Sequence, residues 1–197
     1  LAGTSPITVK GSVTPNTPLK AYFWYHSESD QCSHYESNTF HPTKSSGYFR
    51  DDRWFSQSLD TGRGEYAFSF PVRFSLNNCE WELWAAYLLY TKYAGEKYVD
   101  ISDMKVVQFS PLCSNPANPC NETLLNLTCE DGGFRSLFYC KSKDGRDLKL
   151  EDLFVGPLVT DFVINIEVGP APKFCPETGQ WSTLPCEKTP AKNETTF

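Results

Sequence analysis

Eight cysteines place the strongest constraint on what this chain of 197 residues can fold into. Their number is even and none lies in a C-x-x-C pair, which favours disulfides in an oxidising compartment over a zinc site. Eight cysteines allow about a hundred pairings, and proximity along the chain favours one set of four. The favoured pairs are Cys32–Cys79, Cys113–Cys120, Cys129–Cys140 and Cys175–Cys186.

Period-two alternation over residues 65–90 predicts a β-hairpin with one buried face. Apolar side chains from Tyr66 to Phe74 share one face of an extended chain, and the alternation resumes at Cys79 after an Asn77-Asn78 turn. The same alternation predicts strands elsewhere in the chain. These strands lie at about residues 7–13, 19–25, 104–109, 134–141, 147–153 and 161–168, and Lys143-Asp144-Gly145 is a turn signal between two of them.

Composition agrees with an all-β fold. Aromatic residues make up 15% of the chain, and 26 prolines and glycines supply turns, while aromatic side chains pack well on pleated surfaces. We therefore expect a disulfide-stapled antiparallel β-sandwich of the immunoglobulin or transthyretin type, with a cysteine-rich C-terminal half and no helix. Residues 5–187 are expected to form one domain, with a sub-boundary near 110–119, and 188–197 a flexible tail.

The charge pattern excludes some partners. The net charge is −6 and the isoelectric point is near 5.1. No run of lysine or arginine occurs, so the electrostatic footprint of a nucleic-acid or anionic-membrane binder is missing. An acidic surface suits a partner with a basic patch, and it also simply keeps a protein soluble. No apolar stretch of about eighteen residues predicts a membrane span.

No catalytic motif is visible. G-x-S-x-G and H-E-x-x-H are both absent. His26, Ser27 and Asp30 have the residue types of a hydrolytic triad, but close sequence neighbours on a loop rarely adopt its geometry. We therefore expect no catalytic residue and no enzyme activity.

No metal or cofactor site is expected either. Cys32, His34 and His41 are metal-ligand types, but a disulfide is the expected state of Cys32. Asp144 and Asp147 lack the D-x-[DN]-x-[DN]-G pattern of a calcium loop, and a hairpin turn explains them.

A long, polar and irregular loop is predicted for residues 26–64, tied down by Cys32. It carries the side chains that look most like a binding surface, because aromatic and arginine residues are common at hot spots. The predicted partner-binding residues are Tyr48, Phe49, Arg50, Trp54 and Phe55. The competing interpretation buries Trp54 against the sandwich.

Several motifs together resemble a family of small bacterial periplasmic lipoproteins. They comprise V-x-G-x-V at Val9–Val13, Cys32, the segment Gly64–Val72, C-x-W-x-L at Cys79–Leu83, D-F-x-I-x-I at Asp161–Ile166 and F-C-P-E-T-G-x-W at Phe174–Trp181. Members of that family are similar to immunity proteins encoded beside type VI secretion phospholipase effectors. The resemblance covers roughly residues 5–187.

The resemblance implies a periplasmic protein that binds an incoming lipase toxin and neutralises it by protein–protein contact. Leu1-Ala2-Gly3 resembles the positions that precede the lipid-bearing cysteine of a lipoprotein signal, which would imply a lipid anchor, although a chance match explains these residues equally well. No binding residue is carried over, because the matched positions are core or disulfide positions.

Two other classes stay open. Asn121, Asn126 and Asn193 begin glycosylation sequons, which are used only in a eukaryotic secretory pathway. The tail Gly179–Cys186 resembles the end of a complement-control module, so a eukaryotic secreted or cell-surface binding domain is the alternative. A small secreted hydrolase is the third class.

Overall fold

The computed structural model describes most of the chain. The described residues are 5–28, 32, 34–36, 48–50, 52–95, 99–112, 122–132, 138–145, 152–170, 173–182 and 184–186, with the backbone alone at 34–36, 48–50, 152 and 181. The tail expected at 188–197 lies outside them. Most of these residues lie in β-strands, so the expected all-β fold is confirmed, and one short helix, α1 (Ile101–Met104), is added to it.

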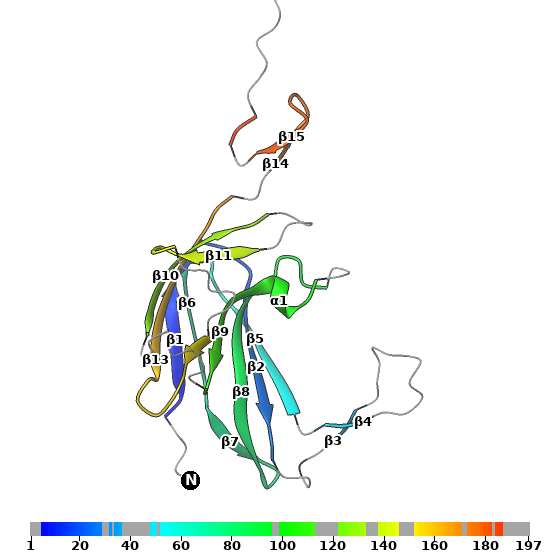
Figure 1. Cartoon of the computed structure of the whole chain (residues 1–197), viewed down its shortest axis with the longest axis vertical. Coiled ribbons are helices and arrows are strands. Elements are labelled where there is room, and N and C mark those ends of the chain that lie inside the picture. Colours follow the sequence, from blue (N-terminus) through cyan, green and yellow to red (C-terminus); the bar gives the residue numbers. More distant parts are fainter. Residues whose placement is uncertain are drawn as a thin grey trace, which may run out of the picture.

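The first sheet has five strands in the order β11-β10-β13-β1-β6 (Figure 1). Its strands are β1 (Ile7–Ser12), β6 (Glu65–Phe70), β10 (Leu124–Glu130), β11 (Tyr139–Ser142) and β13 (Asp161–Val168). β1–β6 and β10–β11 pair antiparallel, but β13 runs parallel to both β1 and β10. The sheet is therefore mixed, which differs from the purely antiparallel expectation.

The second sheet has six strands, with β12-β9-β8-β2-β5 in line and β7 beside the start of β8. Its strands are β2 (Leu19–His26), β5 (Asp52–Leu59), β7 (Arg73–Leu76), β8 (Cys79–Tyr90), β9 (Lys105–Ser110) and β12 (Asp152–Phe154). β12 pairs parallel to β9, and the other pairs are antiparallel.

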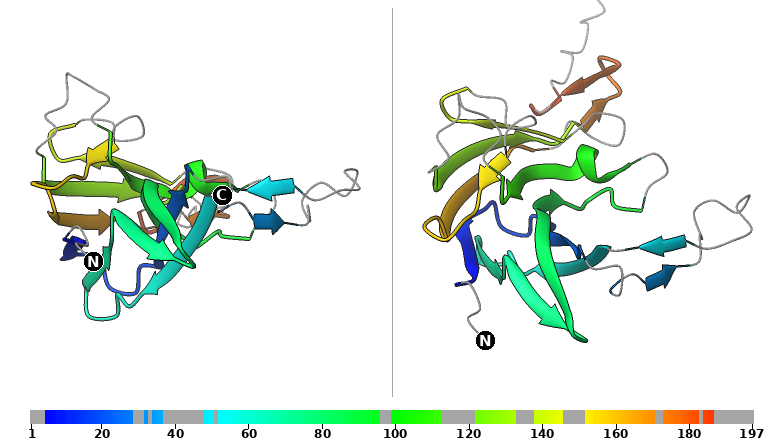
Figure 2. Two further views of the ribbon diagram at one scale, coloured as in Figure 1. Left: turned by 90° about the horizontal axis from the view of Figure 1, so that it is seen from below. Right: turned by 60° about the horizontal axis from the view of Figure 1, so that its bottom comes forward.

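Two small hairpins lie apart from these sheets. β3 (His34–Glu36) pairs with β4 (Tyr48–Arg50), and β14 (Lys173–Cys175) pairs with β15 (Gln180–Ser182). Figure 2 shows the β3–β4 hairpin projecting away from the two sheets.

One hydrophobic core fills the space between the sheets. Phe109 of the second sheet is fully buried, and its ring centroid lies 5.3 to 6.4 Å from those of three first-sheet phenylalanines. These are Phe68, Phe70 and Phe162. The inward positions of both sheets follow the period-two pattern because successive strand residues point to opposite faces.

Three of the four expected disulfides are present: Cys32–Cys79, Cys129–Cys140 and Cys175–Cys186. The fourth expected pair, Cys113–Cys120, lies outside the described residues. Disulfides persist in oxidising environments, so this protein belongs outside the cytoplasm, in a periplasm or an extracellular space.

The predicted hairpin at residues 65–90 is more elaborate than expected. The turn lies where the sequence predicts it, and Asn77 and Asn78 adopt the positive φ angles of 54° and 61° that a two-residue turn requires. However, its first arm is divided, because Pro71 has no N–H to donate and ends β6 in the first sheet. The chain then turns a corner and enters the second sheet as β7.

One other expectation was wrong. Residues 26–64 are not irregular throughout, because 52–59 form β5 and pair with β2 along its whole length. In the hairpin predicted around Lys143-Asp144-Gly145, Gly145 has the positive φ of a turn, but most of the second arm lies outside the described residues. The described ends of the two arms pair with different strands, since β11 pairs with β10 and β12 pairs with β9.

Candidate functional site

An aromatic surface covers the outer face of the second sheet. Alternation along β2 buries Phe23 and Tyr25 and turns Tyr22 and Trp24 outward. Trp54 of β5 lies directly opposite Trp24 and therefore points the same way. In β8, an irregularity opposite Trp24 and Tyr25 shifts the register by one residue and leaves Trp84 exposed.

Four aromatic side chains form a continuous row, which we call the outer aromatic cluster: Tyr22, Trp54, Trp24 and Trp84. The ring centroids of Tyr22 and Trp54 lie 5.0 Å apart, and those of Trp54 and Trp24 stack at 4.7 Å with planes 9° apart. Trp84 lies 5.5 Å from Trp24 and ends the row with 54% of its surface exposed. Contacts between aromatic rings are stabilising, so the four side chains hold one another in place.

Polar side chains border the cluster at one end. Trp24 donates its indole N–H to Asp52 Oδ2 at 3.1 Å, which fixes the ring orientation. His26 lies edge-on to Trp84 at 5.0 Å, and in register it lies between Asp52 and Glu82. Glu82 pairs with Arg73 at 3.0 Å. The border therefore presents carboxylates and a cation beside an apolar surface.

The predicted binding residues do not all share this surface. Trp54 belongs to the outer aromatic cluster, but Phe55, the next residue in β5, points to the opposite face. There it contacts Tyr25 and Phe74, with 41% of its surface exposed. Tyr48, Phe49 and Arg50 form β4, and the positions of their side chains lie outside the described part of the structure.

A second aromatic group thus lies on the inner face of β5, beside the Cys32–Cys79 disulfide. Tyr25 donates its hydroxyl to the carbonyl of Pro71 at 2.8 Å, and burial raises the pKa of this phenol far above its usual value. The Arg53 guanidinium carbon lies 5.0 Å from the ring centroid of Trp81, a cation–π geometry. This group braces the corner between β6 and β7, so we assign it a structural role.

The sequence contained a signal for the missed members of the cluster. Tyr22 and Trp24 occupy the outward positions of a strand whose inward positions are also apolar, and Trp84 alternates with buried residues in β8. A large aromatic residue at the solvent-facing position of an amphipathic strand is the pattern to look for.

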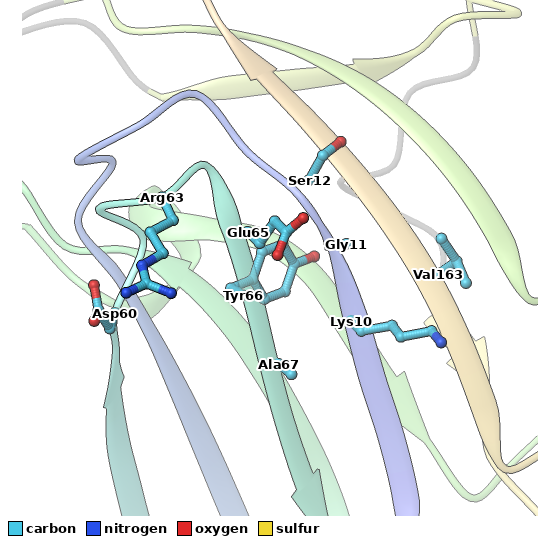
Figure 3. A pocket seen from close by; sticks show the side chains of 9 residues that line it. All are labelled: Lys10, Gly11, Ser12, Asp60, Arg63, Glu65, Tyr66, Ala67 and Val163. Carbon is cyan, nitrogen blue, oxygen red and sulfur yellow. The ribbon is translucent and has the colours of Figure 1, made fainter.

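A hollow lies on the other sheet (Figure 3). It measures about 570 Å³ and lies over β1, β6 and the turn that precedes β6. Its charged rim mixes Lys10 and Arg63 with Asp60 and Glu65, and it is open to solvent. Its buried Tyr66 is already satisfied by the Ile164 carbonyl. The side chains around this hollow do not form a converging set of ligand groups. The hollow is therefore a weaker candidate for a binding site than the outer aromatic cluster is.

The structure describes only some of the candidate catalytic and metal-binding residues. Ser27 is 2% exposed, and Asp30 lies outside the described residues. Cys32 is oxidised in its disulfide, and His41 is not described. No group of three histidine, cysteine or carboxylate side chains placed for a metal ion occurs among the described residues.

The remaining motif residues have local roles where they are described. Asp144 accepts a hydrogen bond from the Ser142 hydroxyl within its turn, and Asp147 is not described. Of the sequon asparagines, only Asn126 is described, and its Oδ1 accepts from Asn165 Nδ2 at 3.0 Å.

Within the described ranges, no helix has the length and apolar character needed to span a membrane. Comparisons of the chain with protein-family models, with curated proteins and with solved structures found no match.

Proposed function

We propose that this protein is a non-catalytic binding protein that engages a protein partner through the outer aromatic cluster. The observation that carries the proposal is the continuous row from Tyr22 to Trp84 on the solvent face of the second sheet. Tryptophan and tyrosine dominate binding hot spots because each buries a large area and loses little side-chain entropy. Four aromatic side chains, each in contact with the next along the row, form a larger apolar patch than singly scattered surface residues do.

The cluster is also held in place before any partner arrives. Three of its members lie on β2 and β8, which have strand neighbours on both sides, and the Cys32–Cys79 disulfide joins the start of β8 to the segment after β2. A preformed surface loses less conformational entropy on binding than a mobile loop does. This rigidity supports a binding role.

The partner we propose is a lipase toxin of a type VI secretion system, which makes this chain a periplasmic immunity protein held at the membrane by a lipid. The motif resemblance supports that choice of partner, and the disulfides agree with the compartment. The net charge of −6 suits a basic toxin surface, because opposite net charges speed association.

The proposal requires that a lipase be encoded beside this gene, and the test uses that lipase. The wild-type protein should bind it and abolish its hydrolysis of phospholipid vesicles. Trp84→Ala should weaken binding by about tenfold or more, which is typical of a hot spot. Phe174→Ala is the matched control, because Phe174 is an aromatic residue of similar exposure, 49%, on the separate hairpin β14–β15.

Two outcomes would count against the proposal. A folded wild-type protein that neither binds nor inhibits the lipase would remove the toxin as partner. Full binding by Trp84→Ala, together with loss in Phe174→Ala, would move the interface away from the outer aromatic cluster.

A secreted or cell-surface binding domain of a eukaryote is the second candidate. It is favoured by the three sequons and by the disulfide-closed hairpin Cys175–Cys186 at the tail. An N-linked glycan on Asn126 in the native protein, detected by mass spectrometry, would favour this candidate over the toxin-binding one.

A further inference from the structure

The strand β5 is an edge strand with an unusually regular backbone. In the part of the chain that the structure describes, β5 pairs only with β2 and ends the order of the second sheet (Figures 1 and 2). All eight of its residues, Asp52 to Leu59, pair with β2 in one uninterrupted register. Alternate N–H and C=O groups of such a strand point away from the sheet, where an added strand can bind them.

Edge strands normally carry devices that prevent pairing with another chain, such as charged side chains, prolines, bulges or short length. The segment Trp54–Leu59 reads W-F-S-Q-S-L and has no charge, no proline and no bulge. The other edges differ. β12 has three residues, β11 has four including Lys141, and β7 has four including Arg73. β6 begins at Glu65, ends at Phe70 and is followed by Pro71.

Both faces of β5 are open where a strand would add. Ser56, Gln57 and Ser58 are all exposed, although successive residues point to opposite faces of the sheet. On the inner face Phe55 is 41% exposed, so the described part of the first sheet does not close over it. An arriving strand can therefore contact Trp54 on one face and Phe55 on the other.

We propose that β5 is the site where an extended segment of a partner protein adds as a further strand. This inference rests on the proposed function and specifies its binding mode. The unpaired backbone groups require an extended polypeptide, because no other ligand presents donors and acceptors at the spacing of a strand. The uncharged edge selects a strand whose central residues are uncharged, with apolar side chains beside Trp54 and Phe55.

A separate protein suits this edge better than a second copy of the chain. Each copy has a net charge of −6, so two copies repel one another as they approach. A basic partner is attracted instead, and its strand then forms the main-chain bonds.

The experiment measures amide hydrogen exchange along β5, in the protein alone and in its complex with the neighbouring lipase. We expect every second amide of β5 to exchange at least about tenfold more slowly in the complex, because only alternate N–H groups face the added strand. Gln57 lies on the inner face, away from the outer aromatic cluster. Gln57→Lys should weaken binding by about tenfold, because a charged side chain on an edge strand opposes the addition of another strand. Ser69→Lys, an exposed position on the other edge strand β6, should bind as the wild type does.

The outcomes separate this inference from the proposed function. If the lipase is bound and inhibited while the β5 amides and the Gln57→Lys affinity stay unchanged, strand addition is wrong and the immunity function stands.

If the lipase does not bind, a short synthetic peptide of alternating threonine and valine replaces it. Alternate protection of β5 by that peptide supports the edge site, and its absence overturns it. Protection that appears with dimerisation of the protein alone, measured by sedimentation, would make a second copy the occupant and overturn the proposal.

Discussion

Gly11 and Ile164 lie on neighbouring strands so closely that a β-carbon on Gly11 would be 1.8 Å from the Ile164 carbonyl oxygen. Tyr66 pairs with Gly11 from the other side, in β6, and donates its hydroxyl to that same oxygen at 2.7 Å. The phenol must therefore cross β1 at the one inward position that has no side chain. This arrangement explains physically why the V-x-G-x-V strand needs its glycine.

Gly11→Ala should consequently destabilise the fold. The new methyl group meets main-chain atoms that cannot rotate away, so two strands must separate and the Tyr66 hydrogen bond must lengthen. We expect the free energy of unfolding to fall by about 3 kcal/mol in urea titrations. Gly169→Ala is the control, because its β-carbon would lie 3.6 Å from the nearest atom, an ordinary contact. Equal losses for the two variants would contradict the explanation.

The buried phenol of Tyr66 should make stability fall at alkaline pH. Burial raises the pKa of Tyr66 well above the ordinary value of 10.0. Above that value the unfolded chain loses a proton that the folded protein keeps, so the free energy of unfolding falls as pH rises. Below it both states are protonated and Tyr66 contributes no pH dependence.

Urea titrations between about pH 9 and pH 11 measure this effect, which amounts to at most about 1.4 kcal/mol per pH unit for one tyrosine. Tyr66→Phe should show a shallower slope than the wild type, because the phenol that titrates is removed. Identical slopes for wild type and Tyr66→Phe would show that Tyr66 ionises in the folded protein.

Removal of the Cys32–Cys79 disulfide should cost more stability than removal of Cys175–Cys186. The two bonds span sequence separations of 47 and 11 residues. On the loop-entropy model, the free energy of unfolding falls by about 4 kcal/mol for the first and by about 3 kcal/mol or less for the second. Double serine variants avoid a free thiol, and calorimetry gives the order. A larger loss at Cys175–Cys186 would show that the hairpin β14–β15 is essential to the core.

Three tryptophans should differ in what they contribute to stability. Trp81 is 1% exposed, so Trp81→Ala should cost about 3–5 kcal/mol. Trp54 is half-buried and stacked, so Trp54→Ala should cost about 1–2 kcal/mol, and the exposed Trp84 less than about 1 kcal/mol. Thermal unfolding checks this order. If Trp54→Ala lowers the midpoint as much as Trp81→Ala does, Trp54 is a core residue and its assignment to a binding surface is wrong.

Local patterns predicted much of this protein but not the candidate site. Alternation located β1, β2, β8 and β13, because side chains on one face of a strand must all meet the core. The segment W-F-S-Q-S-L of β5 shows no clear alternation of apolar and polar residues. Both faces of this edge strand are open, so neither face requires a regular series of apolar residues. Residue type alone predicts Trp54 as a binding residue, and it does not predict its partners Trp24 and Trp84.

The amino-acid sequence by itself determined the strand-forming segments, the Asn77-Asn78 turn and, through cysteine number and spacing, the oxidising compartment. Each of these features depends either on residues that are neighbours in the sequence or on the number and spacing of the cysteines. Tertiary structure alone decided which strands share a sheet, where β13 runs parallel to β1, and where the register of β8 shifts to expose Trp84. Strand pairing is set by long-range contacts between side chains and by the fit of two sheets around one core. The outer aromatic cluster exists only because that pairing brings three distant strands side by side.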